Sequence, residues 1–143
     1  MAPIIVHGWD LSLNHGAAVE LKDGELNDWW YYTDQAGSAG RSKEHGSRLV
    51  ISKDGGVQAW SVRRLVWIEK WMDKTVLVPR RPHFVGVEDY ALDAKHGAHY
   101  KGELGGIARY LLWMRGVRFR LHDPISVKMF ATHDGTAQKD GVE

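Results

Sequence analysis

Two acidic residues at the ends of predicted strands are the best placed in this sequence to do chemistry together. Asp10 follows the apolar segment that begins at Ile4, and Glu88 ends the apolar part of "FVGVEDY", Phe84 to Tyr90. Neighbouring parallel strands lie about 4.8 Å apart, so these acids would emerge side by side at one edge of a sheet. Unpaired carboxylates that close repel each other and raise each other's pKa. A divalent cation between them removes that conflict.

The chemistry open to such a pair is metal-assisted attack on a phosphate ester. Hard oxygen ligands favour Mg²⁺ or Mn²⁺, which keep several waters and bind phosphate oxygens. An ion held in this way can activate water, stabilise a leaving oxygen and position a phosphate, as phosphodiester hydrolysis requires. An aspartate at a strand end is also a common turn or capping residue. Asp10 alone therefore does not decide between the two roles.

The elements that would hold these acids begin with a predicted three-strand meander. The Asp-Gly pair in "KDGE" (Lys22 to Glu25) is typical of a hairpin turn between the second and third strands. The following segment, Asp34 to Ser47, is rich in Gly and Ser without periodicity and is predicted to be a loop. The three strands are predicted at Ile4 to Trp9, Gly16 to Leu21 and Leu26 to Thr33.

Two helices and two further strands complete the predicted order. The helices are predicted over Trp60 to Asp73 and around Leu104 to Leu112, where apolar residues recur at helical spacing. The strands are predicted at Phe84 to Tyr90 and Val117 to His122. Because a helix joins these last two strands, they should be parallel. The predicted fold class is α/β, with a mixed five-stranded sheet, an antiparallel meander and flanking helices in one domain over residues 1–143.

The predicted helices carry two features that bear on packing. Trp60, Trp67 and Trp71 form a stripe, and tryptophans in such a stripe are more often core or interface residues than stacking platforms. The stripe is also a candidate dimer face, because a monomer would tolerate its exposure poorly. Gly105 and Gly106 lower helix propensity, and we interpret them as allowing close packing against the sheet.

Composition narrows the class of protein. The chain has 143 residues, of which 43% are hydrophobic and 26% charged, as in ordinary globular domains. It has no cysteine, which excludes disulfides and thiolate metal sites. Without a basic leader or an apolar run of membrane-spanning length, we expect a soluble cytoplasmic protein. The net charge is +1, with basic segments such as "VPRRPH" that favour a polyanionic partner only weakly.

Four segments in order resemble the RuvC-type Holliday junction resolvases, and the short phage-type members most closely. The segments are "GWDLSLNHGAAVEL", "VGVEDYAL", "YKGELGGIARYLL" and "PISVKMFATHDGTAQKDGV". The resemblance implies the fold of the RNase H-like nuclease superfamily. It further implies a homodimeric, Mg²⁺- or Mn²⁺-dependent endonuclease that resolves four-way DNA junctions by paired nicks. A phage-encoded member would act in the cytoplasm of its bacterial host.

The resemblance assigns the metal site residue by residue. Asp10 falls on the family's first metal-binding aspartate, and Glu88 falls on its second metal-binding acid; both are catalytic in the family. The family completes its site from a helix that follows the segment matching "AQKDGV". This chain ends at Glu143, so we expect it to lack that C-terminal helix. The alternative is that local acids substitute; Asp134, Asp140 and Glu143 lie near the end of the chain, but none matches a family ligand position, and we interpret them as solvated.

The resemblance also implies contacts with DNA. Lys128 and Lys139 match family lysines that contact DNA near the scissile phosphate. The segment after Glu88 corresponds to a mobile part of the family that inserts an aromatic side chain into the junction. Tyr90 and Tyr100 are the candidates for that role, with ordinary packing as the alternative.

Two rival functions remain beside the nuclease. A junction-binding protein of the same fold would bind DNA without cutting it, because its metal site is incomplete. An actin-like ATPase fragment also places an aspartate at the end of its first strand. That second rival fits poorly, because no Gly-rich phosphate loop of a second lobe follows.

Overall fold

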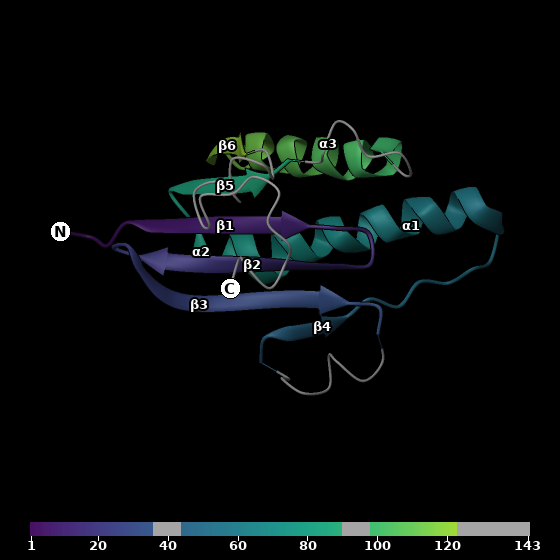
Figure 1. Cartoon of the computed structure of the whole chain (residues 1–143), viewed down its shortest axis with the longest axis horizontal. Coiled ribbons are helices and arrows are strands. Elements are labelled where there is room, and N and C mark those ends of the chain that lie inside the picture. Colours follow the sequence, from purple (N-terminus) through teal and green to yellow (C-terminus); the bar gives the residue numbers. More distant parts are fainter. Residues whose placement is uncertain (36–43, 90–97, 123–143) are drawn as a thin grey trace, which may run out of the picture.

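The computed structural model of this chain describes residues 1–35, 44–89 and 98–122. Its centre is a six-stranded sheet in the order β4-β3-β2-β1-β5-β6 (Figure 1). β1, β2 and β3 form an antiparallel meander, and β5 pairs in parallel with both β1 and β6. The predicted fold class is therefore confirmed. The strands are β1 Ile5–Leu11, β2 His15–Lys22, β3 Glu25–Thr33, β4 Gly46–Arg48, β5 Phe84–Glu88 and β6 Arg118–His122.

The short strand β4 is the difference from the predicted five-stranded sheet. It pairs in parallel with the end of β3, and the N–H of Tyr31 donates to the carbonyl of His45 at 2.8 Å. The prediction placed the start of β4 in a loop, which is wrong for Gly46 and Ser47. Three residues are too few to show the alternation of apolar and polar side chains by which strands are recognised in a sequence.

The turn between β2 and β3 is the one that the Asp-Gly pair predicts. Asp23 and Gly24 both have positive φ, 52° and 85°, as a two-residue turn of the mirror-image type requires. Asp23 also ties this end of the sheet to the start of β1. Its carboxylate accepts the Ile4 N–H at 2.9 Å, and its own N–H donates to the Ile4 carbonyl at 2.9 Å.

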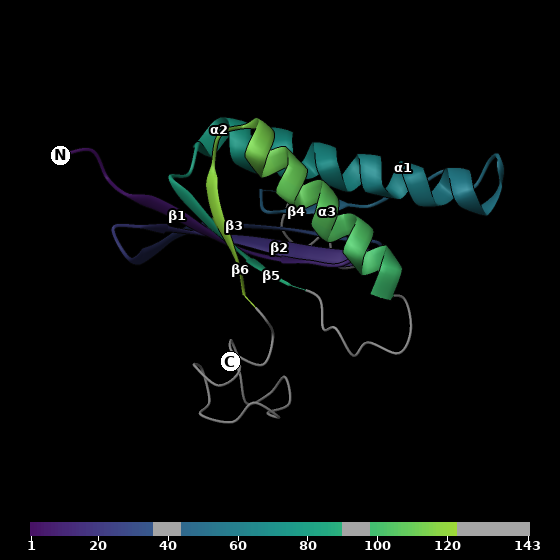
Figure 2. The same ribbon diagram turned by 90° about the horizontal axis from the view of Figure 1, so that it is seen from above.

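The helices of the described residues lie together on one side of the sheet (Figure 2). α1 (Gly56–Lys70) continues through the π-helical segment η2 (Trp71–Leu77) into α2 (Val78–Arg80), and α3 is Ala98–Met114. Both predicted helices are confirmed, but each is longer than its apolar pattern indicated. No helix in the described part of the chain is long and apolar enough to cross a membrane.

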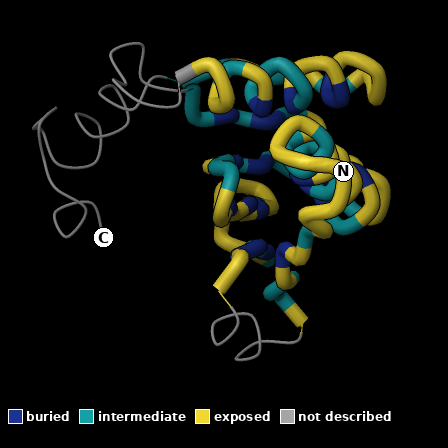
Figure 3. The backbone as a smooth tube through the Cα atoms, turned by 90° about the vertical axis from the view of Figure 1, so that its right-hand side faces the viewer, coloured by how far each residue is buried: buried dark blue, intermediate teal, exposed yellow. Residues whose placement is uncertain are grey.

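The core lies between this helical layer and the sheet, where the buried residues gather in Figure 3. The ring of Tyr32 on β3, which is fully buried, meets Trp67 and Trp71 edge-on at centroid distances of 5.7 and 4.7 Å. Trp60 is half-buried and lies under the Arg64 guanidinium at 4.3 Å. Trp67 and Trp71 therefore pack against the sheet, as the interpretation of the stripe as core residues expects. The use of the stripe as a dimer face stays a prediction.

Candidate functional site

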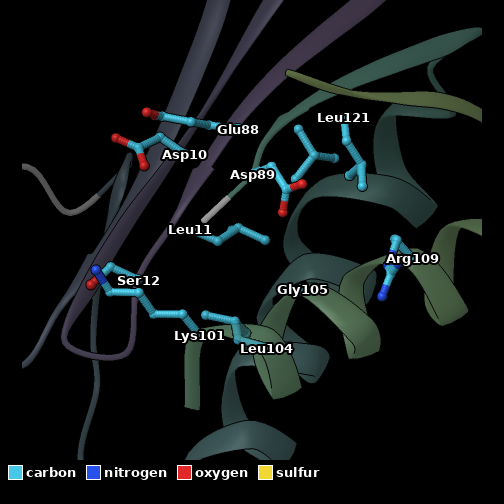
Figure 4. A pocket seen from close by; sticks show the side chains of 11 residues that line it. Asp10, Leu11, Ser12, Glu88, Asp89, Lys101, Leu104, Gly105, Arg109 and Leu121 are labelled. Carbon is cyan, nitrogen blue, oxygen red and sulfur yellow. The ribbon is translucent and has the colours of Figure 1, made fainter. Parts of the chain in front are cut away.

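The two predicted acids meet at the carboxyl edge of the sheet. β1 and β5 pair in parallel through Trp9 and Val87, so the next residues along each strand are Asp10 and Glu88. Trp9 and Val87 are buried against the helical layer, and the alternation of strand side chains turns the two acids to the opposite face. Figure 4 shows Asp10 and Glu88 lying next to each other. Asp10 is exposed and Glu88 is half-buried.

A cavity of about 280 Å³ opens beside the acid pair, between the ends of the strands and α3. Asp10, Glu88 and Asp89 line its strand side, and Lys101 and Arg109 of α3 line its helix side. Figure 4 shows Asp89 turned away from the other two acids. The N–H of Asp89 donates to the carbonyl of β6 residue 122 at 2.7 Å, which fixes the backbone where β5 ends.

The floor of this cavity is apolar. Leu104 of α3 is buried, and Leu11 and Leu121 from the strands are half-buried beside it. Figure 4 shows the carboxylates of Asp10 and Glu88 directed away from these leucines, so the acid pair borders the apolar floor without pointing into it.

A second, more open hollow of about 380 Å³ lies on the side of the sheet away from the helices. It also includes Asp10 and Glu88, and its base is formed by residues with little or no side chain, Gly8, Ala17 and Gly86. His122 of β6 pairs in register with Glu88 and lies over Gly86, where a Cβ would be 3.4 Å from the imidazole ring. Both sides of the acid pair are thus accessible.

The chemistry of the pair fits a hard divalent cation. Mg²⁺ is commonly held by one or two carboxylates together with waters and substrate phosphates. Asp10 and Glu88 supply two such carboxylates from adjacent strands. In residues 1–35, 44–89 and 98–122 no group of three or more His, Asp or Glu side chains could hold a metal ion. The metal site therefore stays a prediction that rests on these two ligands.

The remaining predicted residues divide by position. Tyr100 lies in the first turn of α3 with 40% of its surface exposed, and its ring contacts that of His99 at 3.8 Å. Tyr90, Lys128 and Lys139 lie outside the described residues.

Sequence patterns did not indicate the cations of α3 or His122 as site residues. An isolated Lys or Arg on a helix usually only solvates a surface. His122 becomes visible beside Glu88 only through the register of β5 and β6.

Comparison with known proteins agrees with this architecture. No family model and no curated protein matches the sequence. The structure of RuvC from Thermus thermophilus superposes with a TM-score of 0.62 at 18% identity, over 97% of this chain and 74% of that chain. T. thermophilus RuvC in complex with a Holliday junction substrate superposes with a TM-score of 0.64 at 19% identity over the same shares.

A more distant likeness is to a member of the Ppx/GppA family from Aquifex aeolicus, with a TM-score of 0.42 at 8% identity over 91% of this chain and 38% of that chain. The two matches to RuvC define the class: this chain has the α/β fold of RNase H-like proteins, in the form seen in RuvC. The structural resemblance to RuvC that the sequence segments implied is thereby confirmed.

Proposed function

We propose that this protein is a metal-dependent endonuclease that resolves four-way DNA junctions by paired nicks. The observation that carries the proposal is the meeting of Asp10 and Glu88 at the ends of adjacent parallel strands. Support comes from the fold, which is similar to that of T. thermophilus RuvC, a protein solved in complex with a Holliday junction substrate.

In this proposal each residue has a defined part. Asp10 and Glu88 hold Mg²⁺ or Mn²⁺ through their carboxylate oxygens, and Asp10 is exposed enough for a phosphate to reach it. The ion, when bound, supplies the Lewis acidity that a phosphodiester needs for attack by water. Lys128 and Lys139 contact backbone phosphates, and Tyr90 or Tyr100 stacks on a base at the junction.

A second candidate is a junction-binding protein that does not cut. This candidate is favoured because only two acids, Asp10 and Glu88, converge in the described part of the chain. No third metal ligand joins them among the described residues. A two-metal mechanism holds one ion on each side of the scissile phosphate. Asp10 and Glu88 together provide ligands for the ion on one side of the phosphate.

Cleavage of a synthetic four-way junction in Mg²⁺ tests the first proposal. Asp10→Asn should abolish cleavage, because an amide is a poor ligand for the ion. The same change should leave junction binding intact, because removing a negative charge does not weaken attraction for phosphate. Asp54→Asn is the matched control, since Asp54 is exposed ahead of α1 and lines neither of the two hollows beside the acid pair.

The possible outcomes separate the candidates. Loss of cleavage in Asp10→Asn but not in Asp54→Asn supports the nuclease. Full cleavage by Asp10→Asn removes the acid pair from the mechanism. Tight junction binding by the wild type without cleavage, in Mg²⁺ and in Mn²⁺, selects the binding protein instead.

We also infer that the active form is a homodimer. A four-way junction has two-fold symmetry and needs two nicks, which a symmetric dimer provides. A groove of about 270 Å³ between α1 and the segment before it includes Val50, Val62 and Val66. These side chains are 65%, 58% and 44% exposed, so the outer side of α1 presents apolar surface that a second subunit would cover.

A further inference from the structure

Two adjacent glycines in α3 have no packing reason to be glycine. Glycine weakens a helix interior relative to alanine, and the sequence suggested that Gly105 and Gly106 allow close contact with the sheet. That explanation is wrong for the described residues, because a Cβ at either position would meet none of their atoms within 4 Å. The two positions differ in one respect. Gly105 lines the cavity beside Asp10 and Glu88, and Gly106 does not.

Two cations flank Gly105 along the same wall of the cavity. Lys101 lies four residues before it and Arg109 four residues after it, and both line the cavity. With about 3.6 residues per turn and a rise of about 1.5 Å per residue, the three positions follow one side of α3 over about 12 Å. Both cationic side chains are exposed, and Figure 4 shows them on the helix that lies across the cavity from the strand ends, with the side chains of Asp10 and Glu88 directed away from that helix.

Neither cation is engaged by an acid on its own helix. Positions three and four residues from Lys101 and Arg109 hold Gly, Ala, Leu or Trp, so α3 offers no helical ion pair to either. Among the described residues, neither side chain forms a salt bridge. Their charges are therefore available to an anion in the cavity.

Resting on the proposed nuclease function, we propose that this wall of α3 binds the sugar–phosphate backbone of the DNA strand that enters the site. Lys101 and Arg109 contact phosphates of one strand, and Gly105 leaves the room that the strand occupies between them. Successive phosphates of a strand are spaced about 3.4 Å along the helix axis of DNA. Cations about 12 Å apart would therefore address phosphates three or four steps apart.

Charge fixes where the strand can lie. Asp10, Glu88 and Asp89 line the strand side of the cavity, whereas Lys101 and Arg109 line its α3 side. The α3 wall is the part of this cavity where an anion is attracted directly. A strand held there passes the ends of β1 and β5, where Asp10 and Glu88 emerge.

Filling the space at Gly105 gives the sharpest test. Gly105→Leu and Gly106→Leu place the same side chain on neighbouring positions of one helix, and a Cβ at either position meets no atom of the described residues within 4 Å. Binding to a synthetic four-way junction is measured without divalent cations, and thermal unfolding checks that each variant folds. Gly105→Leu should weaken binding by about tenfold, as the loss of one or two phosphate contacts would. Gly106→Leu should bind like the wild type.

Salt titration tests the two cations. Lys101→Gln and Arg109→Gln should each lower the slope of log K against log salt concentration by about 0.7–0.9. Lys53→Gln, a change at an exposed lysine in the segment before α1, should leave the slope unchanged. Should Gly105→Leu unfold, Gly105→Ala and the two charge variants carry the test.

The outcomes distinguish the phosphate-binding wall of α3 formed by Lys101, Gly105 and Arg109, called the track here, from the nuclease function. If the wild type binds and cuts junctions, but the α3 variants behave like their controls, the track is overturned and the nuclease function stands. If the wild type neither binds nor cuts junctions, both are overturned. Reduced binding confined to Gly105, Lys101 and Arg109 variants supports the track whether or not the protein cuts.

Discussion

A polar network is buried around Glu20, at the opposite end of β1 from Asp10. Glu20 and His7 are each 1% exposed, and the His7 Nε2 lies 3.0 Å from a Glu20 carboxylate oxygen. Arg80 donates to both Glu20 oxygens, at 3.1 and 2.8 Å, and Asn27 donates at 2.7 Å. Burial raises the pKa of Glu20, but these hydrogen bonds outweigh it and hold the pKa below its usual value.

His7 is the neutral partner in this network. Burial lowers its pKa, and the hydrogen bond to Glu20 offsets only part of that effect. The Nδ1 atom of His7 finds no hydrogen-bond partner among the described residues. A neutral ring with its proton on Nε2 donates a hydrogen bond to Glu20. Its Nδ1 then carries no proton and needs no acceptor.

Stability should therefore fall in mild acid. Because the pKa of folded His7 lies below its ordinary value of 6.5, the unfolded chain takes up the proton first as pH falls. The free energy of unfolding contributed by His7 is complete above that value and declines below it, by at most about 1.4 kcal/mol per pH unit. Urea unfolding between pH 7.5 and 5 measures the slope. His7→Gln should flatten it, whereas His15→Gln, at an exposed position, should not; equal slopes in both variants would contradict the assignment.

At the scale of single residues, the sequence predicted the acid pair but not its surroundings. Asp10 and Glu88 were predictable because each follows an apolar run, and the ends of parallel strands converge by geometry alone. Lys101 and Arg109 were not, since a helical cation gives the same pattern whether it faces solvent or a cavity. Gly105 was misinterpreted because a missing side chain indicates close approach without saying what approaches.

At the scale of elements, a glycine in β2 makes room for a buried tyrosine side chain of β3. Gly16 pairs in register with Tyr32, and a Cβ on Gly16 would lie 2.6 Å from the Tyr32 ring. The Tyr32 hydroxyl donates to the carbonyl of Ser12 at 2.6 Å. Tyr32 thus crosses β2 to hold the turn that follows Asp10. The position of the acid depends on this contact as well as on the sheet.

Two glycine substitutions should therefore act in opposite directions. Gly16→Ala forces the buried Tyr32 ring to move and should destabilise the protein by about 1–3 kcal/mol, as overpacking does. Gly106→Ala adds a methyl group that meets no atom of the described residues within 4 Å, and within a helix it should stabilise the protein by about 0.5–1 kcal/mol. Urea unfolding at neutral pH gives both values. A neutral or stabilising Gly16→Ala would show that Tyr32 does not need this space.

Removing only the Tyr32 hydroxyl separates its hydrogen bond from its ring. Tyr32→Phe keeps the aromatic contacts with Trp67 and Trp71 but loses the bond to Ser12, which should cost about 1 kcal/mol of unfolding free energy. If Tyr32 positions the turn after Asp10, the rate of junction cleavage should fall even under conditions where the variant is fully folded. Unchanged cleavage in a folded Tyr32→Phe protein would limit Tyr32 to packing.

The elements themselves were predictable to different degrees. The β2–β3 turn was, because Asp23 and Gly24 have the residue types that positive φ requires. The long helix was predicted to end at Asp73, yet it continues through η2 to Arg80. Its continuation is held by tertiary contacts, since Val76 and Leu77 are buried in the core and Arg115 of the α3 end pairs with Asp73 at 2.7 and 2.5 Å. Such contacts leave no periodic pattern in the sequence.

For the whole molecule, the one-sided placement of the helices decides which surfaces remain for partners. Figure 2 shows α1 and α3 crossing the same side of the sheet. Asp10 and Glu88 emerge where that layered structure ends, with the α3 cavity on one side and the small-residue hollow on the other. Under the proposed function, DNA would approach the acid pair without displacing the core, and the outer side of α1 would be left for a second subunit.

In the proposed dimer, the outer side of α1 forms the contact between subunits, and this contact lets the two active sites nick both strands together. Light scattering should give twice the mass of one chain, and Val62→Glu should give monomers, because burying a carboxylate in an apolar interface is strongly unfavourable. Val57→Glu is the matched control, since Val57 is 76% exposed on the same helix but lies outside the groove that contains Val62.

Monomers retain Asp10 and Glu88, so Val62→Glu should still nick junctions while losing simultaneous cutting of both strands. A Val62→Glu protein that stays dimeric and cuts both strands together would place the subunit contact elsewhere.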